Sequence, residues 1–300
     1  MKKNILALII LTLLSLNISC KAQEQVQLIT SKELPVESLN DTEWHFTMYH
    51  SIEHIDWPIV HLEIGNSAYY FLVDTGALYN YFFGTPNGSM KITKGEHINT
   101  FTINSKIKNR ETRVCFYDQF KSEINSKYKT LGIDGIIGCE FLQNYNNVVF
   151  DYNNRKIIFD TEPISKQSVP LLSFSVYSHC LEFSVDGKTE YGLIDTGSSM
   201  FVIRENFGDG KAFFDRKSLL LANIGKEPIK TRFRNNKIIN NIKIVDTDFK
   251  EIISFEWDSK FINHLDGVQN LAQNISILGN SFWKNHVIQL DFYHSAFRIK

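Results

Sequence analysis

This 300-residue chain has few cysteines, little proline and almost no net charge. The low cysteine count and the low net charge each exclude a class of protein. Four cysteines are too few for a small fold held together by disulfides. A formal net charge of −1 at pH 7 gives no electrostatic reason to bind nucleic acid or anionic lipid. No long stretch has the periodicity of an amphipathic helix, so an all-helical fold is also excluded.

Aromatic residues are what the chain has in quantity. Its 23 Phe and 12 Tyr, against 6 Pro, favour a fold rich in strands. With 43% hydrophobic and 22% charged residues, the chain can bury the cores of one large or two ordinary domains.

The first 22 residues have the pattern of a targeting segment. After a basic start, an apolar core over residues 5–16 is too short for a comfortable membrane span. Two cleavage sites are possible. Residues 16–20 resemble a lipoprotein cleavage box, in which Cys20 would become the lipidated first residue. In the alternative, a general signal peptidase cuts after Ala22. Either end predicts an exported protein in the periplasm or at the outer membrane or cell surface, with a lipid anchor as its one contact with a membrane.

The tripeptide Asp-Thr-Gly occurs twice, each time at the end of an apolar run. The two copies lie in Tyr69–Phe83 and Tyr191–Ile203. Their acidic residues, Asp74 and Asp195, are 195 − 74 = 121 positions apart. A strand that ends this way carries a carboxylate at its tip, and the Gly lets the backbone fold closely against it. We therefore expect two similar lobes that each supply one carboxylate to a shared site.

A second block follows each copy and supports an internal duplication. Residues 134–141 and 275–282 both contain two aliphatic residues, a Gly and a later Phe, with the glycines at Gly138 and Gly279. Strand-like segments follow in both halves, and a Gly-Asn or Asp-Gly turn precedes each Asp-Thr-Gly strand. Ordered recurrence of this kind is typical of duplication. Short helices are expected after the two glycines, over residues 140–145 and 280–284.

Paired Asp-Thr-Gly motifs, each followed by an aliphatic pair and a Gly, resemble the aspartic proteases of the retropepsin-like and pepsin-like group. The resemblance covers roughly residues 58–300. It implies an all-β fold of two similar acid-protease-type β-barrel lobes with an active-site cleft between them. The predicted organisation is a signal peptide (1–22), an N-terminal tether and edge or lobe-closing strand (23–57), a first lobe (58–162), a linker (163–170) and a second lobe (171–300).

By this resemblance, Asp74 and Asp195 form the catalytic pair of an endopeptidase that works as a single chain on polypeptides, without metal or cofactor. Two carboxyls within hydrogen-bond range share one proton, a behaviour for which aspartic proteases are the standard example. One then activates a water molecule, and the other stabilises the carbonyl oxygen under attack. The expected supporting residues are two threonines that would hydrogen-bond one turn to the other, two glycines that would offer N–H groups to the carboxyls, and one serine: Thr75, Thr196, Gly76, Gly197 and Ser198.

The position after each Gly differs between the copies, Ala77 in the first and Ser198 in the second. A hydroxyl that donates to a carboxylate favours its charged form. The sequence therefore predicts that Asp195 is the more readily ionised member of the pair.

Two alternatives stay open. The first is a catalytically silent surface lipoprotein that binds peptides in the cleft, although a pure binder needs neither carboxylate. The second rests on residues 50–54, which match the zinc-protease pattern H-x-x-E-H. That pattern needs a helix, whereas its flanks look extended, which favours ordinary loop histidines. The remaining cysteines are expected as buried free thiols or as one oxidised pair: Cys115, Cys139 and Cys180.

Overall fold

The computed structural model describes residues 34–50, 56–84, 91–93, 99–107, 110–118, 128–129, 131–164, 168–175, 178–204, 217–224, 227–257 and 275–300. Strands dominate these residues, which confirms the predicted all-β class. The proposed signal peptide, with Cys20, lies outside them. Within them, no helix is both long and apolar enough to cross a membrane.

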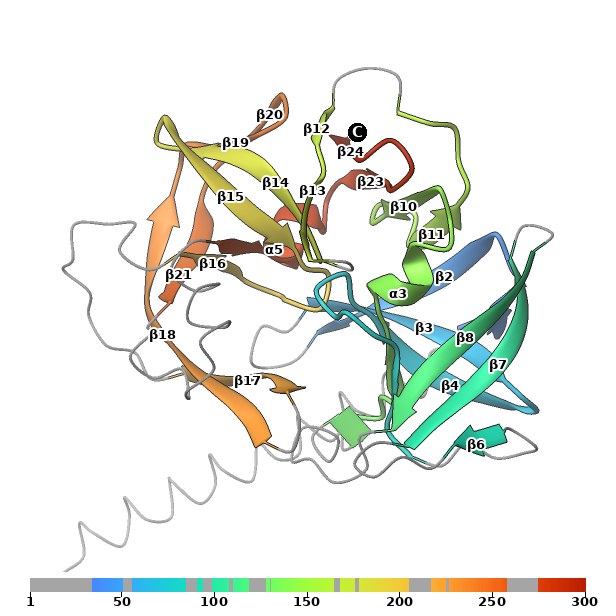
Figure 1. Cartoon of the computed structure of the whole chain (residues 1–300). Coiled ribbons are helices and arrows are strands. Elements are labelled where there is room, and N and C mark those ends of the chain that lie inside the picture. The colour runs from blue at the N-terminus through green and yellow to red at the C-terminus, as the bar shows by residue number, and fades with distance from the viewer. Residues whose placement is uncertain are drawn as a thin grey trace, which may run out of the picture.

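The described strands form a 14-stranded sheet and a 10-stranded sheet. Figure 1 shows two wings, one from each half of the chain, and between them the part of the 14-stranded sheet that we call the central sheet. The wing from the first half contains β1 (Glu37–Ser38), β3 (Asp56–Ile64), β4 (Ser67–Val73), β5 (Tyr81–Phe82), β6 (Lys91–Thr93), β7 (Asn99–Ile107), β8 (Arg110–Asp118) and β9 (Gly135–Ile137). The wing from the second half contains β13 (Leu172–Ser175), β14 (Ser178–Val185), β15 (Lys188–Ile194), β16 (Phe201–Ile203), β17 (Lys217–Ile224), β18 (Glu227–Ile239), β19 (Ile242–Ile244), β20 (Thr247–Phe249), β21 (Ile252–Trp257) and β22 (Ser276–Leu278). The central sheet contains β2 (Glu43–His50), β10 (Asn147–Asp151), β11 (Lys156–Phe159), β12 (Val169–Pro170), β23 (Val287–Asp291) and β24 (Ala296–Ile299).

The strand that ends on Asp-Thr-Gly has the same neighbours in both halves. β4 runs parallel to β9, and β15 runs parallel to β22. The strand after each motif, β5 or β16, pairs antiparallel with the same partner. A four-residue helix begins directly after the glycine of each second block, α3 (Cys139–Leu142) and α5 (Asn280–Trp283), which confirms the two short helices expected there. The duplication read from the sequence is thus present in the strand pairing.

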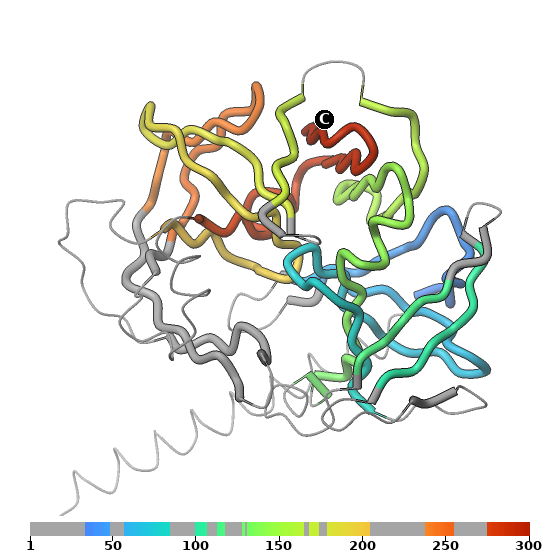
Figure 2. The backbone as a smooth tube through the Cα atoms, viewed as in Figure 1, coloured from blue at the N-terminus to red at the C-terminus, as the bar shows by residue number. Residues whose placement is uncertain are grey.

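The central sheet contains strands from both halves of the chain. β10 pairs antiparallel with β23, with Val149 opposite Gln289. Figure 2 shows the C-terminal segment crossing back to lie beside this part of the first half. β12, from the predicted linker, pairs with β24. The two predicted lobes therefore share a sheet.

Two roles were expected for the strand at the end of residues 23–57. The edge-strand role is wrong, because β2 pairs with β3 on one side and with β11 on the other. The lobe-closing role stays a prediction. The tether expected within residues 23–57 also contains ordered structure, since β1 pairs with β3 and the neighbouring Leu39 is buried. The segment is mostly polar, so its sequence did not predict the buried Leu39. Pairing between distant strands also leaves no local sequence signal.

The main hydrophobic core is continuous across both halves. Aromatic rings fill much of it, as the composition suggests. Phe101 and Phe116 stack with ring centroids 5.2 Å apart in the first wing, and Phe201 meets Phe282 edge-on at 5.0 Å in the second. Edge-to-face and offset contacts of this kind stabilise a core beyond the area they bury. A rigid core beneath both wings gives the Asp-Thr-Gly turns a fixed base.

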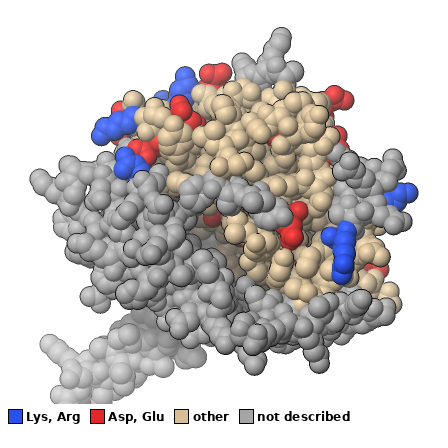
Figure 3. All heavy atoms as spheres, in the orientation of Figure 1, with Lys and Arg blue, Asp and Glu red and all other residues tan. Residues whose placement is uncertain are grey.

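On the face shown in Figure 3, charged side chains of both signs are interspersed, and those of the described residues form no large patch of one sign. This distribution agrees with the near-zero net charge. It gives no sign of a surface built for a strongly charged polymer.

Candidate active site

The two Asp-Thr-Gly turns meet at the junction of the wings and bring Asp74 and Asp195 together. Each carboxyl lies against the glycine of the opposite turn. A Cβ atom added to Gly76 would lie 2.5 Å from Cγ of Asp195, and one added to Gly197 would collide with the carboxyl of Asp74. The two carboxyls hydrogen-bond to each other. Any larger residue at either glycine would displace a carboxyl, which explains why both turns need Gly.

Four hydrogen bonds between the threonines and the opposite turn hold the two turns together. The Thr75 hydroxyl donates to the carbonyl oxygen of Ile194 at 2.8 Å and accepts the Thr196 N–H at 3.0 Å. In return, the Thr196 hydroxyl donates to the carbonyl oxygen of Val73 at 2.7 Å and accepts the Thr75 N–H at 3.0 Å. Both threonines are fully buried. The predicted cross-link is confirmed, and it fixes the distance between the two strand tips.

Gly138 and Gly279 allow the second block of each half to pass close to the turn. A Cβ on Gly138 would lie 2.8 Å from the carbonyl oxygen of Ala77, and one on Gly279 would lie 2.5 Å from that of Ser198. Neither glycine has a positive φ, so close approach explains their presence and backbone strain does not. The residues that follow them donate backbone N–H groups to the same carbonyl oxygens, at 2.9 and 2.7 Å.

The two carboxyls differ in their surroundings. Oδ1 of Asp74 accepts the N–H groups of Gly76 at 2.8 Å and Ala77 at 3.0 Å. Burial raises the pKa of Asp74, while hydrogen bonds from Asp195 and from backbone N–H groups act against that rise. Burial raises the pKa of Asp195 well above its ordinary value, and the neighbouring Asp74 raises it further. Among the described residues, Oδ1 of Asp195 is buried without a hydrogen-bond partner. The arrangement therefore favours an ionised Asp74 and a protonated Asp195.

This assignment reverses the prediction made from Ser198. The Ser198 hydroxyl donates to the carbonyl oxygen of Met200 at 3.2 Å, two residues along its own loop, and accepts the Met200 N–H at 3.3 Å. The hydroxyl is thus engaged within its own loop, and the pKa of Asp195 is not lowered by it. Short polar side chains often hydrogen-bond to backbone groups nearby in sequence. Here that local bond forms in place of the predicted bond to the Asp195 carboxylate.

Aromatic side chains that the sequence did not single out surround the Asp74 side of the pair. Tyr128 stacks on Phe83 at 5.0 Å and lies 5.4 Å from Trp57, in a cluster that also contacts Ala77. Burial raises the pKa of the Tyr128 phenol, and the charges of Asp74 and Asp195 raise it further. Tyr128 therefore lies near both carboxyls. No motif could have identified it, because it lies between the two blocks of the first half that recur in the second half.

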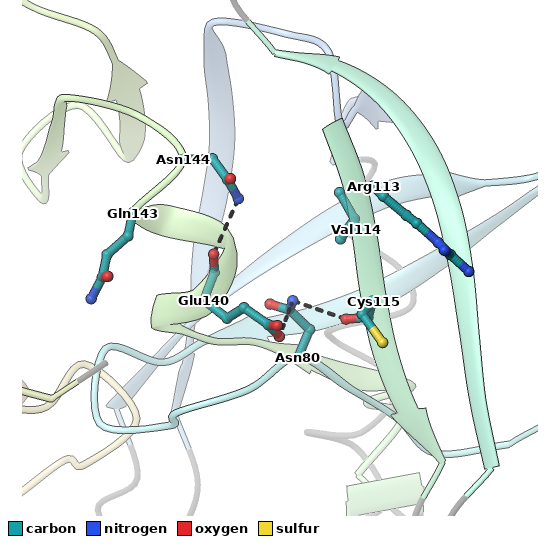
Figure 4. Close-up of a pocket in the computed structure, with 7 residues that line it drawn as sticks. All are labelled: Asn80, Arg113, Val114, Cys115, Glu140, Gln143 and Asn144. Carbon is teal, nitrogen blue, oxygen red and sulfur yellow. Dashed lines mark hydrogen bonds between the residues drawn. The ribbon is translucent and has the colours of Figure 1, made fainter. Parts of the chain in front are cut away.

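A polar pocket of about 320 Å³ lies beside the active-site loop, away from the two carboxyls. Figure 4 shows it between α3 and β8, with the carboxylate of Glu140 directed at the amide of Asn80. Asn80 is engaged by the framework, since it donates to the carbonyl oxygen of Cys115 at 3.1 Å and accepts the Gly138 N–H at 3.0 Å. Through these two bonds, Asn80 ties the loop that follows Asp74 to β8 and to the second block.

Within the described residues, the remaining sequence motifs give no second centre. His50 ends the strand β2 and so is not on the helix that H-x-x-E-H requires, while His54 lies outside the described residues. No group of His, Cys, Asp and Glu in the described part of the chain could hold a metal ion. The three described cysteines are free thiols, with Cys139 and Cys180 buried and Cys115 partly exposed.

Comparison with known proteins leaves the site to be interpreted from its own geometry. The chain matches no model of a protein family, and no curated protein is significantly similar to it.

Proposed function

We propose that the protein is an aspartic-type endopeptidase of two acid-protease-like lobes, which hydrolyses peptide bonds with a water molecule activated between Asp74 and Asp195. The observation that carries this proposal is the reciprocal packing of the two carboxyls against the opposite glycines, beneath which the threonines lock the turns together. A structural role alone would not need two buried acids in contact, because burying like charges is costly.

In the proposed reaction, the ionised Asp74 takes a proton from the attacking water. The protonated Asp195 donates a hydrogen bond to the amide carbonyl oxygen, which stabilises the charge that develops there. Collapse of the tetrahedral intermediate releases a carboxylic acid and an amine, and the amine takes up the proton that Asp74 removed from the water. The backbone N–H groups on Asp74 and the buried surroundings of Asp195 support this division of roles. No metal or cofactor takes part.

The substrate proposed is a polypeptide in extended form, and the protein is proposed to act as a monomer. Duplication within one chain supplies both carboxyls, so a second copy is not needed to complete the pair. Nucleic acid is not proposed as a partner. We also propose export, through the N-terminal segment, with a lipid on Cys20 as one way to hold the enzyme at a membrane.

The test is cleavage of an unstructured protein by the purified chain at pH 3–7, read by mass spectrometry of the products. Pepstatin should inhibit the reaction, and Asp74→Asn and Asp195→Asn should each abolish it. Asp151→Asn is the matched control, because that partly exposed carboxylate caps its own turn, at 2.9 Å from the Asn154 N–H, in the central sheet. Cleavage that a chelator stops, and that survives Asp74→Asn, would favour a metalloprotease instead. Binding of peptides without any cleavage would support the silent lipoprotein.

A further inference from the structure

Asn280, the first residue of α5, holds the turn that carries Asp195. Its Nδ2 donates to the carbonyl oxygen of Thr196 at 2.6 Å, and its backbone N–H donates to that of Ser198 at 2.7 Å. These two carbonyls lie on either side of Gly197. Asn280 is fully buried, so no water competes for these contacts. One residue thus holds the peptide group that precedes Gly197, the glycine that faces Asp74, and the peptide group that follows Ser198.

Tyr152 determines how the side-chain amide of Asn280 is oriented. Its hydroxyl donates to Oδ1 of Asn280 at 2.6 Å, across 128 residues of sequence. The phenol ring is buried and meets Phe46 edge-on at 5.5 Å, which positions the hydroxyl. Burial keeps the pKa of Tyr152 well above its ordinary value, so the phenol remains a donor. Because Oδ1 accepts this bond, Nδ2 must point at the Thr196 carbonyl oxygen.

The other half of the duplication has neither polar group. Cys139 stands after Gly138 where Asn280 stands after Gly279, and Phe292 follows Asp291 where Tyr152 follows Asp151. The Cys139 thiol donates to the carbonyl oxygen of Thr75 at 3.2 Å, a weaker contact of the same kind. Phe292 has no hydroxyl to offer. Both positions differ between the halves together, so the strong bracing occurs only beneath Asp195.

We propose that Tyr152 and Asn280 form a positioning pair that aims the Asp195 carboxyl by fixing its turn. This inference rests on the proposed function, and it assigns neither residue a contact with substrate. The backbone N–H groups of Gly197 and Ser198 act on the Asp195 carboxyl and lower its pKa. The Gly197 N–H belongs to the same peptide group as the Thr196 carbonyl oxygen that accepts Nδ2 of Asn280. Loosening the pair therefore weakens the hold of the Gly197 N–H on Asp195 and lets its carboxyl move.

The experiment uses the full chain with Tyr152→Phe, Asn280→Cys and the double variant, each of which copies the other half. Tyr145→Phe is the matched control, since it removes the hydroxyl of another buried tyrosine, bonded at 3.3 Å to the carbonyl oxygen of Leu39, with Asp41 and not the active-site pair as its acidic neighbour. Each single variant should lower kcat about tenfold, or about 1.4 kcal/mol of barrier, with KM changed less than about twofold. The double variant should lose little more than either single one, because the two residues act as a unit.

Two readouts separate positioning from a loss of stability. The alkaline limb of the pH–rate profile should move to higher pH in both single variants, because N–H bonds that lower the pKa of Asp195 are weakened. Carboxyl ¹³C NMR of Asp-labelled protein, assigned with Asp195→Asn, should show the same rise in the Asp195 titration without any need for turnover. Tyr145→Phe should move neither readout.

Two results would overturn the proposal. One is an Asp195 titration that stays at its wild-type pH in Tyr152→Phe and Asn280→Cys. The other is a kcat loss in these variants that Tyr145→Phe matches. The NMR titration does not depend on catalysis. A wild-type chain that fails to cleave would therefore refute the proposed function, and the titration would still test the role of Tyr152 and Asn280.

Discussion

Removing one threonine hydroxyl from the cross-link between the turns should destabilise the protein severely. Thr75→Val keeps the shape of the side chain but loses its bond to the Ile194 carbonyl oxygen and its acceptance of the Thr196 N–H. An unpaired buried donor or acceptor costs about 1–3 kcal/mol. Two such groups give a loss of about 4 kcal/mol in the free energy of unfolding. That is a large fraction of the 5–15 kcal/mol that roughly bounds natural proteins.

A serine at the same position isolates the hydroxyl from the rest of the side chain. Thr75→Ser keeps both hydrogen bonds and loses one methyl group, which costs about 1 kcal/mol. The expected gap between the two variants is therefore about 3 kcal/mol. Thr196→Val and Thr196→Ser should show the same gap, because the network is reciprocal. Thr189→Val, at an exposed position of β15, should change little.

The assay is urea unfolding at pH 5, followed by the fluorescence of the buried Trp44 and Trp283. A Thr75→Val variant within 1 kcal/mol of Thr75→Ser would refute the reasoning, since it would mean that the turns are held by packing and not by the hydroxyls. Cleavage measured on the same samples below their unfolding midpoint should be lost in the valine variants and largely kept in the serine variants.

The remaining predictions concern pH. Folding raises the pKa of Asp195, so at pH values above the ordinary range for Asp the folded state keeps a proton that the unfolded state has lost. The free energy of unfolding therefore falls as pH rises through that interval. Asp195→Asn should remove that slope and be the more stable protein near pH 7, measured by urea unfolding from pH 4 to 8. Burial lowers the pKa of His179 to about 4, so its contribution is present above about 6.5 and is lost as pH falls toward 4. His179→Gln should flatten this acid loss, and an unchanged pH dependence in either variant would contradict the assignment.

The parts of the site that lie within one short segment could be predicted from the sequence. A strand ending in Asp-Thr-Gly specifies its own turn, and its repetition indicated that two such turns meet. The threonine cross-link followed from the resemblance to a known family, and the hydrogen bonds of Thr75 and Thr196 confirm it. These features depend on backbone geometry that a few adjacent residues determine.

Features that depend on the packing of distant segments could not be predicted. Tyr152 and Asn280 are 128 residues apart, and neither has a local pattern that would pair them. The insertion of β2 between β3 and β11 likewise depends on the whole central sheet. The error at Ser198 is of another kind, because its position was known but its hydroxyl donates to the carbonyl oxygen of Met200 in its own loop.

Duplication explains why the site is symmetric in its backbone and asymmetric in its chemistry. In the proposed reaction, two identical carboxyls would not suffice, because one must lose its proton and the other must keep its own for water to be activated. In the structure, the threonines and glycines repeat in both halves, whereas the differences lie in the layer beneath. Asn280 and Tyr152 brace Asp195 on one side, and Cys139 stands alone on the other. Once the repeated backbone had brought the two acids into contact, changes in this layer could assign them separate roles without disturbing the turns themselves.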